Sequence, residues 1–123
     1  MNSGRVVGEK LSRDDRLRKR TEFEECYVSG VRVSGRHLLL FLLSRPDAAR
    51  PRIGISVSKR VGDAVTRNRV KRRIRELFRR KRPAGAFQIV VNARPSAAGV
   101  VFSELERDFR DCLGRAILRA NRT

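Results

Sequence analysis

The sequence predicts a single compact domain of the α+β class, built as a two-layer sandwich of helices and a sheet. Its 123 residues suit one domain. Hydrophobic residues make up 40% of the chain, which is enough for a modest core and argues against a wholly disordered chain. The periodic segments follow the order helix, strand, strand, helix, strand, helix, without internal repeats or a linker.

The N-terminus shows no periodic pattern, because residues 1–15 mix glycine, serine and charged residues. We expect these residues to form a mobile arm before a single domain that spans residues 16–120. The arm lacks the apolar stretch of a signal peptide, and no apolar run in the chain approaches the ~20 residues that cross a bilayer. The sequence therefore predicts a cytoplasmic protein that is not anchored in a membrane.

A first helix is expected from Thr21, because Thr21 and Glu24 have the T-x-x-E spacing of a capping box. Phe23 and Tyr27 lie four residues apart and share one face of this helix, and Gly30 is expected to end it. Two rings on one face either pack into the core or offer a stacking surface to a ligand.

Two apolar runs, at residues 36–44 and 52–58, predict two strands. Pro46 and Pro51 mark the short connection as a loop, so the two runs are expected to pair as an antiparallel hairpin. The second run alternates between an apolar face and a face of small or polar residues, which are Gly54, Ser56 and Ser58. Such a face makes a poor core, but it allows a nucleotide backbone to approach closely.

A long helix is expected at residues 63–82. Asp63 or Thr66 can cap its start, and Pro83 with Gly85 ends it.

The last strand is expected at residues 86–94, and the last helix near Ser103, which has capping-box spacing with Glu106. The residues that follow the 3.6-residue helical period are Leu105, Phe109, Cys112, Leu113, Ala116 and Ile117.

The helix at residues 63–82 is amphipathic and strongly basic. On a helical wheel its apolar residues fall within an arc of about 100°, and they are Val70, Ile74, Leu77 and Phe78. The opposite side carries Asn68, Arg72, Arg75 and Arg79, with Lys71 beside them. Residues 59–82 contain twelve cations and two acids, so more than half of the net charge of +17 lies in a fifth of the chain.

This charge predicts a polyanionic partner. Like charges at i,i+3 and i,i+4 destabilise a helix by roughly 0.2–0.5 kcal/mol per pair, and a polyanion relieves that repulsion. Nucleic acid is the first candidate, an anionic membrane surface is the second, and a solvated face without a partner is the remaining alternative. Arginine pairs bidentately with phosphate and stacks on bases, which favours nucleic acid.

The sequence gives little indication of catalysis by the protein. His37 is the single histidine and has no Ser–His–Asp or Cys–His context, and the acids lack metal-ligand spacing. Cys26 and Cys112 have neither zinc nor disulfide-framework spacing and are expected to be buried apolar residues. We therefore expect no catalytic residue and no metal bound by the protein alone.

The segment GISVSKRVGDAVTRNRVKRRIRELFR, residues 54–79, resembles the signature of the bacterial ribonuclease P protein component. The core of the resemblance is the RNR motif at residues 67–69, followed by Val-Lys-Arg and the basic helix. The similarity covers roughly residues 17–118 and includes the expected first helix, in RLRKRTEFEECYVSGVRV.

The resemblance implies a central, mainly antiparallel four-stranded sheet, with the basic helix in a left-handed βαβ crossover. General handedness rules favour the right-handed connection, so the residues alone do not predict this. Three strands are evident, and the fourth is expected around Ser56 to Lys59 or as a split of an adjacent run.

The resemblance also implies a function: a protein subunit that assists a catalytic RNA in removing the 5′ leader from precursor tRNA. Magnesium would be held mainly by that RNA, and no protein partner would be required. The basic helix would bind the RNA subunit through Arg67, Asn68, Arg69, Lys71, Arg72, Arg75 and Arg79. A cleft between the first helix and the sheet would hold the leader through Phe23, Tyr27, Phe41, Ser56, Ser58, Lys59 and Arg60.

Two other functions stay open at this point. A basic ribosomal or DNA-binding module could read a groove with Arg67, Asn68 and Arg72, although a strand, and not the partner helix of a helix-turn-helix, precedes them. Competition by duplex DNA would identify it. A small nuclease that acts alone would cleave precursor tRNA with magnesium and without RNA.

Overall fold

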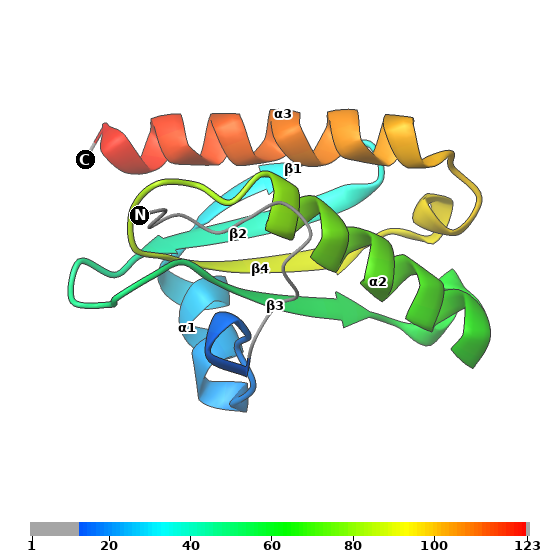
Figure 1. Cartoon of the computed structure of the whole chain (residues 1–123), viewed down its shortest axis with the longest axis horizontal. Coiled ribbons are helices and arrows are strands. Elements are labelled where there is room, and N and C mark those ends of the chain that lie inside the picture. The colour runs from blue at the N-terminus through cyan, green and yellow to red at the C-terminus, as the bar shows by residue number, and fades with distance from the viewer. Residues whose placement is uncertain (1–12, 123) are drawn as a thin grey trace, which may run out of the picture.

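The computed structural model describes residues 13–122, so the first twelve residues of the predicted arm lie outside the described residues. Within these residues three α-helices and a four-stranded sheet form the fold, together with three short 3-10 helices, and Figure 1 shows their arrangement. The elements are η1 (Arg13–Asp15), α1 (Arg20–Ser29), β1 (Val31–Ser34), β2 (Leu38–Ser44), β3 (Arg52–Val57), η2 (Lys59–Val61), α2 (Ala64–Arg80), β4 (Phe87–Ala93), η3 (Pro95–Ala98) and α3 (Phe102–Asn121). The predicted order of helices and strands is confirmed, with one additional strand.

The sheet is mixed, and its strand order is β1-β2-β4-β3. β1 pairs with β2 and β2 with β4 in antiparallel orientation, whereas β3 and β4 are parallel. The predicted β2–β3 hairpin is therefore wrong, because β4 lies between these strands. Residues 87–91 of β4 are all buried, which suits a central strand covered on both faces. β3 has an exposed Ser56 and lies at the edge.

The fourth strand is β1, which was expected around Ser56 to Lys59 or as a split of an adjacent run. Residues 59–61 form the 3-10 helix η2 instead. β1 follows α1 directly and forms the hairpin of the fold with β2, closed by the Gly35 N–H that donates to the Leu38 carbonyl at 2.7 Å. Its four residues gave too short an alternation to be recognised as a strand.

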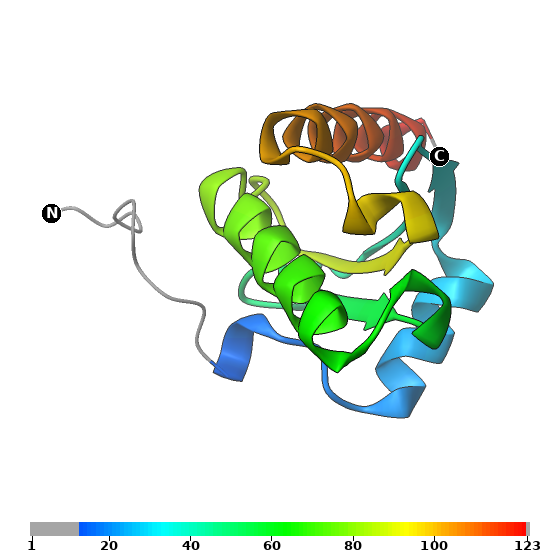
Figure 2. The ribbon, with the colours of Figure 1, turned by 90° about the vertical axis from the view of Figure 1, so that its right-hand side faces the viewer.

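The connection from β3 through α2 to β4 is left-handed. In Figure 1 both strands point to the right with β4 above β3, and the turned view of Figure 2 places α2 on the side of the sheet nearest to the viewer of Figure 1. With the connecting helix on this side, the βαβ unit has the left-handed sense, whereas most such units are right-handed. The crossover implied by the family resemblance is confirmed.

The two faces of the sheet carry separate cores. α2 and α3 cover one face, and the larger core there includes Leu40, Ile89, Val91, Phe78 and Phe109. α1 covers part of the opposite face, where the smaller core consists of Leu17, Cys26, Phe41 and Val90. The helices therefore leave part of the second face open, beside α1.

The two capping boxes predicted for α1 and α3 are wrong. α1 begins at Arg20, and the Glu22 carboxylate accepts hydrogen bonds from the backbone N–H groups of Arg18 and Lys19 at 3.1 and 3.0 Å. α3 begins at Phe102, and no side chain caps it. Gly30 ends α1 as predicted, and its N–H donates to the Cys26 carbonyl.

Glu22 makes the stability of the fold depend on pH. Burial raises the pKa of its carboxyl, but the N–H groups of Lys19 and Arg18 and the Arg52 guanidinium outweigh burial and lower it. A carboxyl with a lowered folded pKa stabilises the protein above its unfolded pKa of about 4.3, and this stabilisation is lost as the pH falls through the folded pKa.

We expect Glu22→Gln to reduce the free energy of unfolding at neutral pH and to flatten its decline in acid. Urea unfolding of both proteins between about pH 3 and pH 7 measures this. Glu24→Gln is the matched control, because Glu24 is an exposed carboxylate of the same helix that pairs with Arg20. Equal pH profiles for the wild type and Glu22→Gln would contradict the assignment.

None of the helices described for residues 13–122 combines the length and the apolar character needed to cross a bilayer.

Candidate RNA-binding surfaces

α2 presents one apolar and one cationic side, as predicted. Val70, Ile74, Leu77 and Phe78 have no exposed surface and lie in the larger core. Asp63 caps the helix, because its Oδ1 accepts from the Thr66 N–H at 2.9 Å. This backbone hydrogen bond, and then one from the Thr66 hydroxyl, lower the pKa of Asp63.

The predicted RNA-subunit-binding residues of α2 differ in how exposed they are and in whether they make contacts within the chain. Asn68 and Arg72 are exposed, whereas the other five are half-buried. Three of those five make contacts within the chain. Arg67 Nε donates to the Gly62 carbonyl at 3.2 Å, Arg69 donates to the Ala98 carbonyl at 3.1 Å, and Arg79 pairs with Glu76. Lys71 and Arg75 line a small pocket at the edge of β3.

Sequence reasoning missed the role of Arg73, which lies on the same helix. Its guanidinium donates to the Val100 carbonyl at 2.9 Å, as Arg69 does to Ala98 one turn earlier. Two arginines of α2 therefore tie the helix to the segment before α3. The i,i+4 spacing of Arg69 and Arg73 was visible in the sequence, but their acceptors were not.

Phe23, one of the two predicted leader-binding residues of α1, contacts β3 at Gly54. The Phe23 ring lies directly on Gly54, and a Cβ built at Gly54 would be 2.5 Å from the Phe23 Cζ atom. Phe23 remains half-exposed. The absence of a side chain at Gly54 therefore leaves room for the outer edge of the Phe23 ring against β3.

Tyr27 and Phe41 form an edge-to-face pair, with ring centroids 4.8 Å apart and planes at 79°. Tyr27 is 39% exposed, whereas Phe41 is buried in the smaller core at 7%. The Tyr27 hydroxyl donates to Asn92 Oδ1 at 3.1 Å, which fixes the ring. Phe41 thus supports Tyr27 from below and offers little surface of its own to a ligand.

The other four leader-binding residues lie together at the end of β3 and in η2. Ser56, Ser58, Lys59 and Arg60 are all exposed. Two hydroxyls and two cations therefore continue the surface that begins at Phe23. We call the surface formed by these four residues with Phe23 and Tyr27 the α1–β3 surface.

A small pocket of about 100 Å³ joins the α1–β3 surface to α2 at the edge of β3. Its charged lining residues are Arg16, Lys71 and Arg75, and Phe23 forms one wall. Burial lowers the pKa of Arg75, and repulsion by Arg16 lowers it further. Three cations and an aromatic ring line the same small pocket, which is an arrangement suited to a nucleotide phosphate. Arg16 was not among the predicted site residues, because it lies at the boundary of the expected arm.

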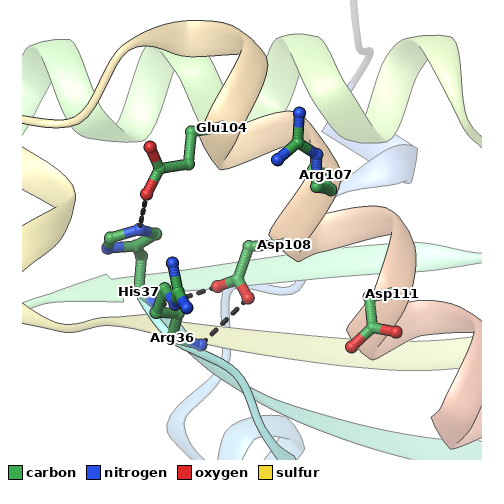
Figure 3. A pocket seen from close by; sticks show the side chains of 6 residues that line it. All are labelled: Arg36, His37, Glu104, Arg107, Asp108 and Asp111. Carbon is green, nitrogen blue, oxygen red and sulfur yellow. Dashed lines mark hydrogen bonds and ion pairs between the residues drawn. The ribbon is translucent and has the colours of Figure 1, made fainter.

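A second pocket of about 310 Å³ lies between the β1–β2 turn and α3, and it is lined by Arg36, His37, Glu104, Arg107, Asp108 and Asp111 (Figure 3). His37 is 8% exposed. Its Nδ1 lies 2.7 Å from Ser96 Oγ and its Nε2 lies 2.8 Å from Glu104 Oε2. The sequence showed no such context, because the partners are 59 and 67 residues away.

Both cysteines are buried and free. Burial, with a smaller contribution from nearby carboxylates, raises the pKa of Cys26 and of Cys112 to about 11. These thiols are therefore protonated at neutral pH and serve as core residues. Within residues 13–122, no group of three or more His, Cys, Asp or Glu side chains is arranged to hold a metal ion.

Known proteins share this sequence and this fold. The sequence model of the Ribonuclease P family matches residues 11–117. Among similar chains, the ribonuclease P protein component of Kocuria rhizophila is 42% identical over 107 residues, covering 85% of this chain and 93% of its own length. That of Gluconacetobacter diazotrophicus is 39% identical over 110 residues, covering 87% and 95%.

Solved structures agree with the sequence match. The RNase P protein of Staphylococcus aureus superposes with a TM-score of 0.77 at 32% identity, over 83% of this chain and 94% of that protein. The RNase P protein of Thermotoga maritima gives 0.72 at 30% identity, over 81% and 96%. The chain therefore belongs to the ribonuclease P protein family.

Proposed function

We propose that this chain, as the protein subunit of the ribonucleoprotein endoribonuclease ribonuclease P, uses two surfaces for two RNAs. The exposed side of α2 binds the catalytic RNA. The α1–β3 surface holds the single-stranded 5′ leader of precursor tRNA. The protein thereby raises the affinity of the enzyme for precursor over mature tRNA and lowers the repulsion between two polyanions.

The observation that carries this proposal is the pocket lined by Arg16, Lys71 and Arg75 at the edge of β3. It lies between the two surfaces and places three cations beside the Phe23 ring. A strand of RNA that leaves the catalytic core along α2 meets these cations first and the aromatic surface next. Stacking on an aromatic ring tolerates any base, which suits leaders of varied sequence.

Magnesium is proposed to be held mainly by the RNA subunit, where it would activate the water that cleaves the phosphodiester. The protein contributes binding and orientation. Arg72 and Asn68 are exposed on α2 and positioned to contact phosphate and sugar, while the arginines tied to carbonyl groups keep the helix in place.

Reconstitution tests the proposal. We expect the protein, mixed with ribonuclease P RNA at low magnesium concentration, to produce 5′ processing of precursor tRNA. The logarithm of the RNA affinity should fall with the logarithm of the salt concentration by roughly 0.7–0.9 per phosphate contacted. Cleavage by the protein and magnesium without RNA, or easy displacement of the RNA by duplex DNA, would contradict it.

A further inference from the structure

The side chain and backbone of His37 connect three elements that are distant in the sequence. Its backbone carbonyl accepts from the Arg94 N–H at 2.9 Å, at the end of β4. Its backbone N–H donates to Asp108 Oδ2 at 2.8 Å, on α3. Its ring nitrogens contact Ser96 of η3 and Glu104 of α3, and Figure 3 shows the contacts with Glu104 and Asp108. All four polar groups of one buried residue are therefore used.

The contacts of the imidazole ring bracket the segment at residues 95–101. Ser96 lies near its start and Glu104 lies just after its end, so one ring fixes both sides of an irregular connection. Ala97 is fully buried and anchors the same segment in the larger core. Both ring contacts are partly buried, and breaking one leaves a nitrogen of the buried imidazole without its protein partner, so together they favour one conformation of this segment.

α2 is hydrogen-bonded to the same segment, residues 95–101. The Ala98 and Val100 carbonyl oxygens accept from Arg69 and Arg73 at 3.1 and 2.9 Å. Figure 2 shows η3, in gold, beside the first turns of α2 and next to the start of α3. These two hydrogen bonds therefore help to hold α2 in its orientation about its own axis, together with its buried apolar side.

We infer that His37 is a positioning residue for the RNA-binding helix: with Ser96 and Glu104 it fixes residues 95–101, whose carbonyl groups orient α2 through Arg69 and Arg73. His37 contacts this segment through Ser96 and acts on RNA only through it. The inference rests on the proposed function, since the oriented side of α2 is the side that binds RNA.

The first test uses the free protein and needs no RNA. Ser96→Ala removes the hydroxyl beside Nδ1, Ser96→Thr retains a hydroxyl, and Ser103→Ala changes an exposed serine in the first turn of α3. We expect Ser96→Ala to shift the guanidinium ¹H–¹⁵N resonances of Arg69 and Arg73. We expect Ser96→Thr and Ser103→Ala to leave these resonances close to their wild-type positions. Unchanged resonances in Ser96→Ala would overturn the inference.

The second test measures the affinity of the same variants for ribonuclease P RNA at physiological salt. Loss of the partly buried Ser96–His37 hydrogen bond predicts a roughly three- to tenfold weaker complex for Ser96→Ala. In a background with Arg69→Ala and Arg73→Ala, adding Ser96→Ala should change the affinity by less than about twofold, because the connection to α2 is already lost.

The outcomes separate the two proposals. If Ser96→Ala weakened RNA binding by its full three- to tenfold in the background with Arg69→Ala and Arg73→Ala, the positioning role would be overturned, because Ser96 would then act by another route. Shifted guanidinium resonances together with no effect of Arg72→Ala on RNA affinity would leave the positioning role intact and overturn the proposed RNA surface of α2. His37→Ala serves as a further variant wherever it retains the wild-type circular dichroism spectrum.

Discussion

The double variant Arg67→Ala with Arg72→Ala should bind ribonuclease P RNA about 30- to 1000-fold more weakly than the wild type. This range corresponds to about 1–2 kcal/mol for each charge-assisted phosphate contact that is lost. Arg72 is exposed on α2, and Arg67 lies one turn earlier, with its Nε on the Gly62 carbonyl and its guanidinium half-exposed. Titration of labelled RNA with the protein at several salt concentrations measures the affinity. The slope of its salt dependence should fall by about 1.4–1.8.

The fold of this variant should be retained with a stability close to that of the wild type, because two small gains offset the loss of the Arg67 hydrogen bond to the Gly62 carbonyl. Alanine has the highest helix propensity, and removing two cations reduces the repulsion along α2 by a few tenths of a kcal/mol per pair. If the variant binds RNA less well but unfolds at the same or a higher temperature, the two arginines contribute to RNA binding and not to the stability of the fold. Lower stability would instead mean that the lost contacts serve the fold.

Arg107→Ala with Arg110→Ala is the matched control, because it removes the same charge from exposed positions of α3. At physiological salt the Debye length is about 8 Å, so distant charges act weakly on a bound phosphate. We expect the control to weaken RNA binding by less than about threefold. Equal losses in the two double variants would show that net charge, and not the side of α2, determines the affinity.

The features that the sequence predicted well are local ones. The apolar side of α2 was evident because Val70, Ile74, Leu77 and Phe78 repeat within three turns of one helix, and all four are fully buried. The cap at Asp63 depends on a residue three positions away. Such patterns are contained in a window of a few residues, so they survive without knowledge of the rest of the fold.

The features that the sequence did not predict depend on distant parts of the chain. The place of β4 between β2 and β3 depends on which strand is covered on both faces, and this is decided by the packing of α1 against one side and of α2 and α3 against the other. The hairpin prediction considered only neighbours in sequence. One local feature was also missed: the first helix begins one residue before Thr21, because Glu22 reaches back to the Lys19 N–H.

The site was predicted in the same uneven way. The cations of α2 were visible as a run. In contrast, the proximity of Arg16 to Lys71 and Arg75, and of His37 to Ser96 and Glu104, appears only when segments 55 to 67 residues apart come together. The resemblance to the family supplied residues for the leader surface. The structure shows that these residues differ in role, since Phe41 is buried beneath Tyr27 and Phe23 lies on Gly54.

Phe23→Ala should reduce the affinity of the reconstituted enzyme for precursor tRNA about 5- to 150-fold and leave the affinity for mature tRNA nearly unchanged. This range corresponds to about 1–3 kcal/mol for one base stacked on an aromatic ring. Gly54→Ala tests the geometry while keeping the ring, because its Cβ would lie 2.5 Å from the Phe23 Cζ atom and force the ring away from the sheet. We expect Gly54→Ala to weaken precursor binding in the same direction.

Phe102→Ala is the matched control for the loss of a ring. Phe102 is a half-buried phenylalanine on α3 that packs against the larger core, with the Arg80 guanidinium 5.3 Å from its ring centre. Its loss should lower stability but should not distinguish precursor from mature tRNA. Binding of both tRNAs, measured with a leader of at least several nucleotides, separates the cases. If Phe23→Ala weakens both ligands equally, the ring stabilises the fold and does not hold the leader, and the α1–β3 surface loses its assignment.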